Sequence, residues 1–473
     1  LGGSLVRVPD HPGVHAAALE GGAGVGRGQV HRLDVGVFEA GVFEGEAREL
    51  GARAERADLA GHESGQDHIG LYLRNGNEYL ESMIAGYQAR VAPFNVSYRY
   101  VEEELLYLLR DSHAAALVYN AEFAPRVAHI RDQLPDLKVL IQVADESGND
   151  LLPGAVDYES IVDTPAPADA LPAPTGDDLY ILYTGGTTGM PKGVLWRQHD
   201  IFMSAMGGRP FLAAGEELRS YDDLVKQATE QAGFRSLLLI PPLMHGAAQW
   251  GVFNTISSGG WIALPDNVRH LDADAVLRLA ERERVLSLPV VGDAMARPLL
   301  DLIETGDYDL SGLMGITNGG APLSPTVRDR LLTALPNAFI MDAVGASESG
   351  AQMTTIATKG AETKAATFTP LDDTTVVSAD FSRVLQPGEG EGWLARREFV
   401  PLGYLGDAEK TARTFPTIDG VRWSIPGDKA RLLADGQIEL LGRDSVTINS
   451  GGEKIFAEEV ERAVASHPAV YDV

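Results

Sequence analysis

The sequence contains no cysteine, and this absence excludes several kinds of site. Without cysteine there is no disulfide framework, no thiol nucleophile and no thiolate zinc site. Long hydrophobic runs are also missing, since no apolar stretch approaches the ~18 residues that a membrane span needs, and no basic segment followed by an apolar core opens the chain. We therefore expect a cytoplasmic protein without an integral membrane span.

Positive charge is scarce relative to negative charge. Lys and Arg number 39 against 67 Asp and Glu, which gives a formal net charge of −28. The electrostatic field of this negative charge repels phosphate backbones and anionic membrane surfaces, so a nucleic-acid partner is disfavoured. An anionic ligand has to be captured locally instead, by backbone N–H groups, a metal ion or single cations.

The first 66 residues lack Lys, Ile, Met, Thr, Asn, Trp and Tyr altogether, and Phe38 and Phe43 are their only aromatic side chains. This segment has few large apolar side chains and no sustained period of 2 or 3.6, so no core can be assigned to it. Residues 1–66 are either a mobile arm or a stretch read out of frame from a GC-rich coding region, because the missing residue types largely have AT-rich codons. We expect the segment to be unpacked and easily cleaved before His68.

The remainder of the 473 residues alternates between strand and helix patterns, and its length indicates two or three domains. Strands are expected at 69–73, 91–96, 114–119, 139–143, 179–183, 237–240, 285–290 and 339–341, and helices at 78–88, 102–110, 124–133 and 324–335. This alternation predicts an α/β fold with a parallel sheet covered by helices. Residues 165–174 indicate a linker, and the short runs 393–396, 430–433 and 438–441 indicate an antiparallel end.

The strongest local signal is a run of glycine and threonine that follows the expected strand 179–183 and leads to Lys192; its members are Thr184, Gly185, Gly186, Thr187, Thr188 and Gly189. Backbone N–H groups of glycine and the threonine hydroxyls donate to phosphate oxygens, and Lys192 adds a mobile positive charge. The run is not a Walker loop, because Gly193 follows Lys192 where that loop needs Ser or Thr. It predicts a polyphosphate site, and the alternative is a surface turn.

The same run resembles the phosphate-binding signature of the adenylate-forming superfamily, which includes acyl-CoA synthetases. Further matches follow in the order that the superfamily requires: 242–246 (Pro-Leu-x-His segment), 318–323 (adenine loop), 345–348 (Gly-x-Thr-Glu motif), 427–428 (ribose aspartate), 442–443 (hinge) and 450–455 (loop near the CoA thiol arm). The variants at Gly185, Gly186 and Ser347 are most similar to actinobacterial acyl-CoA synthetases, including those acting on sterol side chains.

This resemblance implies a large multi-sheet N-terminal domain of the acyl-CoA synthetase and luciferase type at residues 67–442. A hinge and the start of a small α+β C-terminal domain would follow at residues 443–473. The superfamily's adenylation lysine lies farther downstream than Val473, so we expect a truncated chain that keeps nucleotide binding but has reduced acyl-AMP formation.

The resemblance also implies a two-step reaction with ATP, Mg²⁺ and CoA. ATP and a fatty or sterol side-chain acid give acyl-AMP and pyrophosphate, and CoA then displaces AMP. Lys192, His245 and Glu348 would be catalytic, with Glu348 the carboxylate ligand of Mg²⁺, a suitable hard oxygen donor. The plain alternatives are a solvated loop carboxylate for Glu348 and a core histidine for His245. The resemblance leaves room for a homodimer.

The remaining contacts implied by the resemblance are with nucleotide and CoA. Ser347 and the glycine-threonine run would bind phosphates; Gly319, Gly320, Ala321 and Asp342 adenine; Asp428 and Arg443 ribose or phosphate; and Gly451, Gly452 and Lys454 the CoA arm. Two departures stand out, since Val344 replaces the tyrosine that stacks on adenine, and Ser445-Val446 replaces a Lys-Asp pair in the hinge. Asp342 would then compensate by accepting from the adenine amine.

Two rival functions are open to test. The segment Gly345-Ala346-Ser347-Glu348-Ser349 nearly spells the serine-hydrolase elbow, but Ser349 stands where the sharp turn needs Gly, and the phosphate run would be unexplained. The other rival is a nucleotide-binding remnant or pseudoenzyme of the same fold. Release of AMP in the presence of ATP, CoA and an acid would separate an enzyme from a remnant.

Overall fold

The computed structural model describes residues 65–162, 174–184, 190–209, 220–361, 366–443, 447–450 and 453–456, and residues 460, 464 and 470. Almost all of the unusual N-terminal segment and of the predicted linker lies outside the described residues, as do residues 185–189, 451 and 452. Gln66 is described, and its side chain accepts from the N–H of Leu179 at 2.7 Å and donates to the carbonyl of Arg90 at 2.8 Å.

An eight-stranded sheet forms the first part of the fold, in the order β17-β7-β6-β2-β1-β3-β4-β5. Its strands are β1 (His68–Tyr72), β2 (Ala92–Asn95), β3 (Ala114–Asn120), β4 (Val139–Val143), β5 (Val156–Asp157), β6 (Leu179–Thr184), β7 (Lys192–Arg197) and β17 (Gly403–Tyr404). Strands β1 to β5 pair in parallel, as the alternation predicts, and β6 joins β2 in parallel before β7 returns antiparallel to it. The phosphate-loop residues therefore connect two paired strands.

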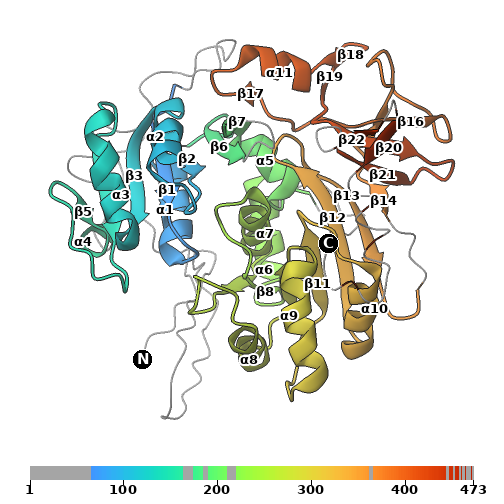
Figure 1. Ribbon diagram of the computed structural model, residues 1–473, viewed down its shortest axis with the longest axis horizontal. Helices are drawn as coiled ribbons and strands as arrows, with labels where there is room; N and C mark the ends of the chain where they lie inside the picture. The colour runs from blue at the N-terminus through green and yellow to red at the C-terminus, as the bar shows by residue number, and fades with distance from the viewer. Residues whose placement is uncertain are drawn as a thin grey trace.

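Helices α1 (Asn77–Gln88), α2 (Glu102–Asp111), α3 (Ala124–Ile130) and α4 (Glu159–Val162) surround this sheet, in the blue and cyan part of Figure 1. Glu104 accepts from the backbone N–H of Val101 at 3.0 Å, which satisfies a free donor at the start of α2. The helix expected at 124–133 ends at Ile130 and continues as the 3₁₀ turn Arg131–Gln133.

A second sheet has 13 strands, and its main path runs β18-β19-β16-β20-β21-β14-β13-β12-β11-β10-β8-β9. In chain order its first strands pair in parallel with one another. They are β8 (Ser236–Leu238), β9 (Trp261–Ala263), β10 (Ser287–Val290), β11 (Gly315–Gly319) and β12 (Phe339–Ala346). The others, antiparallel where paired, are β13 (Gly350–Ala357), β14 (Thr367–Pro370), β15 (Thr374–Val377), β16 (Gly390–Arg397), β18 (Thr417–Ile418), β19 (Val421–Ser424), β20 (Asp428–Leu432) and β21 (Ile438–Arg443). This arrangement confirms the predicted change to an antiparallel end.

The described residues after β7 include seven further helices: α5 (Gln198–Ala205), α6 (Tyr221–Glu230), α7 (Gly246–Ser257), α8 (Ala273–Glu283), α9 (Gly292–Thr305), α10 (Pro325–Ala334) and α11 (Ala408–Thr414). Helix α10 begins as predicted, because the Ser324 hydroxyl accepts from the N–H of Val327 at 3.3 Å. Val327 and Leu331 are buried on its inner face. A hairpin of β22 (Thr447–Ser450) and β23 (Glu453–Phe456) ends the described strands.

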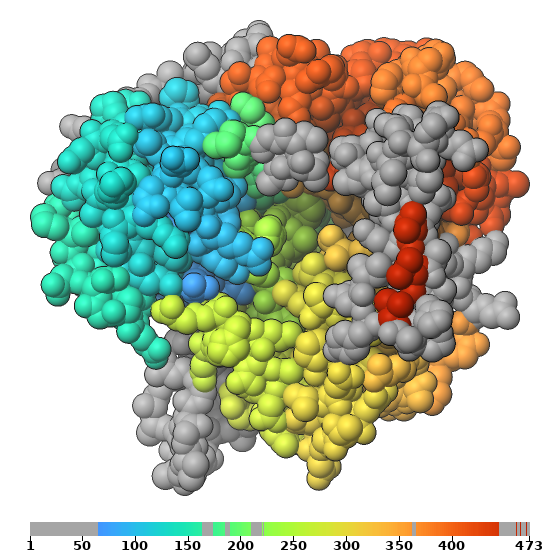
Figure 2. Space-filling model, in the orientation of Figure 1, coloured from blue at the N-terminus to red at the C-terminus, as the bar shows by residue number. Residues whose placement is uncertain are grey.

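One hydrophobic cluster joins the two sheets. It contains Tyr180 and Leu182 from β6, Trp196 from β7 and Val252 from α7. Helix α7 lies in the middle of Figure 1, and in Figure 2 the green part of the chain is set back between the blue and yellow parts. Within the described residues, no helix is both long and apolar enough to cross a membrane.

Candidate active site

The predicted metal ligand lies in a tight turn between β12 and β13, which we call the Glu348 turn (residues 347–350). Two main-chain carbonyls of this turn accept hydrogen bonds from distant strands. Trp196 of β7 donates its indole N–H to the Ser347 carbonyl at 2.9 Å, and Ser424 of β19 donates its hydroxyl to the Glu348 carbonyl at 2.5 Å. The turn is therefore held by its backbone, which leaves the side chains of Ser347 and Glu348 for a ligand.

Tyr404 of β17 fixes the Glu348 side chain. Its phenol donates to Oε1 of Glu348 at 2.8 Å. Burial and the charge of Glu348 raise the pKa of Tyr404, so the phenol keeps its proton and remains a donor. The second carboxylate oxygen, Oε2, has no hydrogen-bond partner among the residues that the structure describes. A carboxylate with one oxygen oriented and the other available suits a hard cation such as Mg²⁺.

The adenine-loop residues lie at the ends of neighbouring parallel strands. Asn318 of β11 accepts from the N–H of Gly292 at 2.8 Å and donates to the Ala321 carbonyl at 3.0 Å, so it shapes the loop that contains Gly319 and Gly320. It also donates to Oδ1 of Asp342 at 2.8 Å.

Asp342 is less available than the sequence indicates. It is buried, and Arg328 donates to its Oδ2 at 2.6 Å while Asn318 donates to its Oδ1. An adenine amine would have to share one of these oxygens with a protein donor, which a carboxylate's spare lone pairs allow. A role for Asp342 in adenine binding therefore remains a prediction.

Thr184 and Lys192 bracket the phosphate loop and are paired in register between β6 and β7. The Lys192 ammonium lies 3.6 Å from Oδ1 of Asp111. Partial burial would lower the pKa of Lys192, but the charges and hydrogen bonds of Asp111 and Tyr107 outweigh burial and raise it. Lys192 is thus a cation beside the loop, while Gly185, Gly186, Thr187, Thr188 and Gly189 lie outside the described residues.

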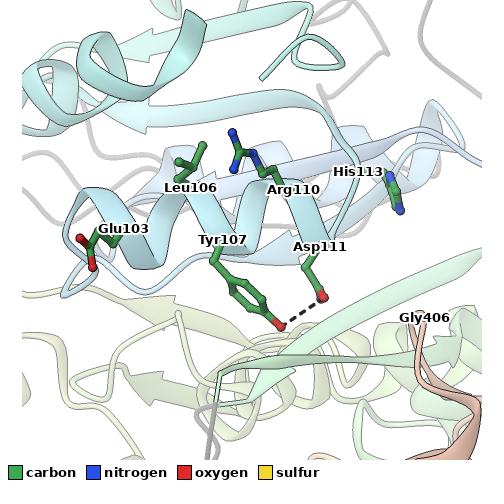
Figure 3. Close-up of a pocket in the computed structure, with 7 residues that line it drawn as sticks. All are labelled: Glu103, Leu106, Tyr107, Arg110, Asp111, His113 and Gly406. Carbon is green, nitrogen blue, oxygen red and sulfur yellow. Dashed lines mark hydrogen bonds between the residues drawn. The ribbon is translucent and has the colours of Figure 1, made fainter. Parts of the chain in front are cut away.

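Asp111 at the end of α2 binds two tyrosines as well as Lys192. Its carboxylate also accepts from the phenols of Tyr183 at 2.9 Å and Tyr107 at 3.2 Å. Figure 3 shows Tyr107 and Asp111 projecting from the same side of α2. They line a surface pocket of about 540 Å³ together with Glu103, Leu106, Arg110, His113 and Gly406.

His245 precedes α7 in a segment that two asparagines hold. Asn75 donates to the Pro241 carbonyl at 2.9 Å and accepts from the Leu243 N–H at 2.7 Å. The His245 side chain is exposed, and desolvation by the surrounding protein and the charge of Arg99 lower its pKa below the usual 6.5. A neutral imidazole near pH 7 can accept a proton or a hydrogen bond.

Asn95 is the other asparagine, and it joins two of the predicted site segments. Its amide donates to the Tyr183 carbonyl at 2.9 Å and to the Met244 carbonyl at 2.7 Å, and its oxygen accepts from the Tyr183 N–H at 2.7 Å. The end of β6 and the His245 segment therefore lie side by side. Trp196 of β7 also donates to the Ser347 carbonyl, so the β6–β7 pair contacts both the His245 segment, through Asn95, and the Glu348 turn.

Asp428 and Arg443, the expected ribose contacts, are direct partners on β20 and β21 and form an ion pair with Nε and Oδ1 3.2 Å apart. Contact of either side chain with a ribose remains a prediction. Gly451 and Gly452 lie outside the described residues, and Lys454 is described only as a backbone position in β23.

Sequence reasoning missed Asn75, Asn95, Trp196 and Tyr404. Asn75 and Asn95 act through bonds to residues 88 to 168 positions away, and no local pattern indicates such contacts. Tyr404 follows Gly403 in a two-residue strand, which is too short to show a hydrophobic period.

Comparisons with known proteins show the family of this chain. A family described as "AMP-binding enzyme" matches residues 54–405. The chain is 59% identical over 428 residues to the medium-chain acyl-CoA ligase Mig of Mycobacterium avium, a match that covers 90% of this chain and 77% of that protein. It is 40% identical over 415 residues to a 3-oxocholest-4-en-26-oate–CoA ligase of Rhodococcus rhodochrous, which covers 86% of this chain and 74% of that protein.

Solved structures show the same fold. An anthranilate CoA ligase, AuaEII, in complex with anthranoyl-AMP matches with a TM-score of 0.70 at 22% identity, over 86% of this chain and 74% of that one. A long-chain-fatty-acid–CoA ligase of Archaeoglobus fulgidus matches with a TM-score of 0.64 at 19% identity, over 86% and 76%. The predicted α/β fold is confirmed. The chain belongs to the AMP-binding enzyme family, and within it to the acyl-CoA synthetase type.

Proposed function

We propose that this chain converts a medium-chain fatty acid to its acyl-CoA by way of acyl-AMP, with ATP and CoA as co-substrates. The observation that carries this proposal is the 59% identity to a medium-chain acyl-CoA ligase over 90% of the chain. The contacts that β6 and β7 share with the His245 segment, through Asn95, and with the Glu348 turn, through Trp196, support it, because activation of a carboxylate by ATP needs phosphate charge to be neutralised where the acid attacks.

A sterol side-chain acid is the second candidate substrate. Ligases named for both medium or long-chain fatty acids and 3-oxocholest-4-en-26-oate are 40–42% identical to this chain, for example 42% in Mycobacterium marinum. Both candidates carry a carboxylate on a large apolar body, so the chemistry at the carboxylate is the same and only the apolar pocket differs.

In this proposal Thr184, Lys192, Ser347 and residues 185–189 bind the phosphates of ATP. Mg²⁺, when bound at Glu348, neutralises phosphate charge. Tyr404 orients the Glu348 carboxylate, and Lys192 holds a positive charge beside the loop. Neutral His245 would lie close to the carboxylate of the acid.

The nucleoside and the second substrate occupy neighbouring surfaces. Gly319, Gly320 and Ala321 would contact adenine, and Asp428 with Arg443 the ribose. The CoA arm would reach the acyl-AMP past Gly451, Gly452 and Lys454. A cytoplasmic location and a homodimer are further parts of the proposal, and size-exclusion chromatography with light scattering tests the dimer.

A comparison of acids tests the function. Purified protein is given ATP, Mg²⁺ and CoA with either decanoate or 3-oxocholest-4-en-26-oate, and pyrophosphate release and acyl-CoA are measured. We expect decanoyl-CoA, with a higher kcat/KM for decanoate than for the sterol acid. A higher kcat/KM for the sterol acid would select the second candidate, and nucleotide binding without product from either acid would favour the remnant.

A further inference from the structure

A buried ion pair lies directly behind the Glu348 turn. The Arg396 side chain of β16 is fully buried, and its Nη2 lies 2.8 Å from Oδ2 of Asp373, which is 2% exposed. Removing two charges from water costs several kcal/mol per ion unless geometry and hydrogen bonds compensate. Burial lowers the pKa of Arg396 and the charge of Asp373 partly offsets this, which leaves the pKa at about 10, so Arg396 is charged at neutral pH.

Arg396 donates its hydrogen bonds to the Glu348 turn and to the residue that follows it. Its Nη1 donates to the Ser349 carbonyl at 2.8 Å and to the Ala351 carbonyl. Ser349 is the residue next to Glu348, and its carbonyl also accepts from the Ser204 hydroxyl at 3.4 Å. One guanidinium therefore binds the carbonyls on both sides of Gly350, at the end of the turn.

The backbone at Gly350 explains why the turn needs this support. Its φ is +66°, and a Cβ there would collide with the Ser204 hydroxyl and approach Nη1 of Arg396. The left-handed backbone and the close packing leave the turn a single arrangement that depends on these side chains.

A second arginine holds the same carboxylate. Arg209, which follows α5, donates from Nη2 to Oδ2 of Asp373 at 2.6 Å and from Nε to the Met203 carbonyl at 3.0 Å. Its guanidinium also lies 4.8 Å from the ring centre of Phe399. Asp373 is thus the shared anchor of two cations from separate elements.

We propose that Arg396, anchored by Asp373, is a positioning residue for the Glu348 turn and hence for metal-bound ATP. It touches no substrate and acts through the carbonyls of Ser349 and Ala351. This inference rests on the proposed role of Glu348 as the metal ligand. Lysine cannot replace Arg396, because one ammonium cannot span two carbonyls and a carboxylate with the fixed fork of a guanidinium.

The test measures how much Mg²⁺ strengthens ATP binding, which needs neither an acid nor turnover. The dissociation constant of ATP is measured by calorimetry in EDTA and in Mg²⁺ for wild type, Arg396→Lys and Asp373→Asn. Arg330→Lys is the matched control, because Arg330 of α10 also pairs with two carboxylates, Asp301 and Glu304, but at the surface. Thermal unfolding checks that each variant is folded.

We call Arg396→Lys and Asp373→Asn the core variants, and we expect both to bind ATP in EDTA as wild type does. The gain in affinity that Mg²⁺ provides should be about tenfold smaller in them, and unchanged in the control Arg330→Lys. An unchanged gain in folded variants, or a loss of binding in EDTA alone, would overturn the inference. If neither core variant folds, Arg209→Lys carries the test. This substitution changes a partly exposed side chain. A threefold loss of the Mg²⁺-dependent gain supports the inference, and an unchanged gain overturns it.

Glu348→Gln separates this inference from the proposed function. If that variant keeps the full Mg²⁺-dependent gain, Glu348 is not the metal ligand and the inference loses its basis, whereas the proposed reaction still stands or falls with the comparison of acids. If Glu348→Gln abolishes the gain but the arginine and aspartate variants keep it, only the inference is wrong.

Discussion

Glu348 owes its orientation to groups from four strands that are all distant from it in the sequence. Its carboxylate is held by Tyr404 and its carbonyl by Ser424, while Trp196 and Arg396 hold the neighbouring carbonyls. Such preorganisation means that the carboxylate does not have to be ordered when ATP binds.

Glu348→Gln tests the carboxylate itself. Glutamine keeps the shape and can still accept from Tyr404, but it lacks the negative charge that a metal requires. We expect the fold to persist and pyrophosphate release to fall by about a hundredfold, equivalent to ~3 kcal/mol of transition-state stabilisation. Glu146→Gln, at an exposed loop position, is the control. A rate near that of wild type would remove Glu348 from the metal site.

Tyr404→Phe removes the donor that orients Glu348 and leaves the ring in place. One hydrogen bond to a charged group contributes ~1.5–3 kcal/mol, so we expect roughly a tenfold or larger fall in kcat and a higher Mg²⁺ concentration for half-maximal rate. Tyr308→Phe is matched, because Tyr308 also donates to a carboxylate, Asp274, at 2.6 Å on an exposed surface. An unchanged Mg²⁺ dependence would show that Glu348 does not need Tyr404.

The helices and strands were largely predictable because local signals determine them. The strand at 139–143 and the helix started by Ser324 were found with nearly the observed bounds. Strand β12 was expected to end at residue 341 but extends to Ala346, since its continuation pairs with β13, from Asp342 with Thr355 to Ala346 with Gly350. Pairing of this kind depends on where the chain returns, which hydrophobic periodicity does not record.

Asn95→Asp tests how three elements are joined, because Asn95 links β2 to the end of β6 and to the segment before α7. Aspartate removes the amide donor and places a charge against the carbonyls of Tyr183 and Met244. We expect a loss of ~1–3 kcal/mol in the free energy of unfolding and a higher KM for ATP. Denaturant unfolding and initial rates measure these changes. Asn149→Asp, which loses one bond to the Ala121 carbonyl near the surface, should change neither much.

At the scale of the whole molecule, the motif order identified the family, but the sequence could not locate the residues that support the site. The glycine-threonine run, the histidine segment and the Glu348 turn are separated by 50 or more residues, and their order alone carries a resemblance. The contacts among them pass through Asn95, Trp196 and Arg396, whose partners become visible only when the two sheets pack together.

The net charge of −28 also acts on the whole molecule. At Glu81 of α1, neighbouring acids add to the effect of burial on one carboxylate. Its carboxylate accepts from the Tyr158 phenol at 2.5 Å. Burial and, to a smaller extent, the charges of Glu78 and Glu159 raise the pKa of Glu81 to about 7 from 4.5. Between these values the folded state binds more protons than the unfolded state. The contribution of Glu81 to stability is therefore fully present below about pH 4.5 and is lost as the pH rises through 7.

Glu81→Gln should remove this dependence, because the amide is neutral at every pH and its oxygen can still accept from Tyr158. We expect the variant to gain ~1–2 kcal/mol over wild type at pH 8, a value reduced from the full shift because the site is partly exposed, and to show a much smaller gain at pH 5. Urea unfolding at the two pH values measures the difference. Glu103→Gln, at an exposed position on α2, supplies the background effect of removing one negative charge. If both substitutions stabilise the protein equally at pH 8, general repulsion accounts for the effect, and the burial of Glu81 contributes nothing of its own.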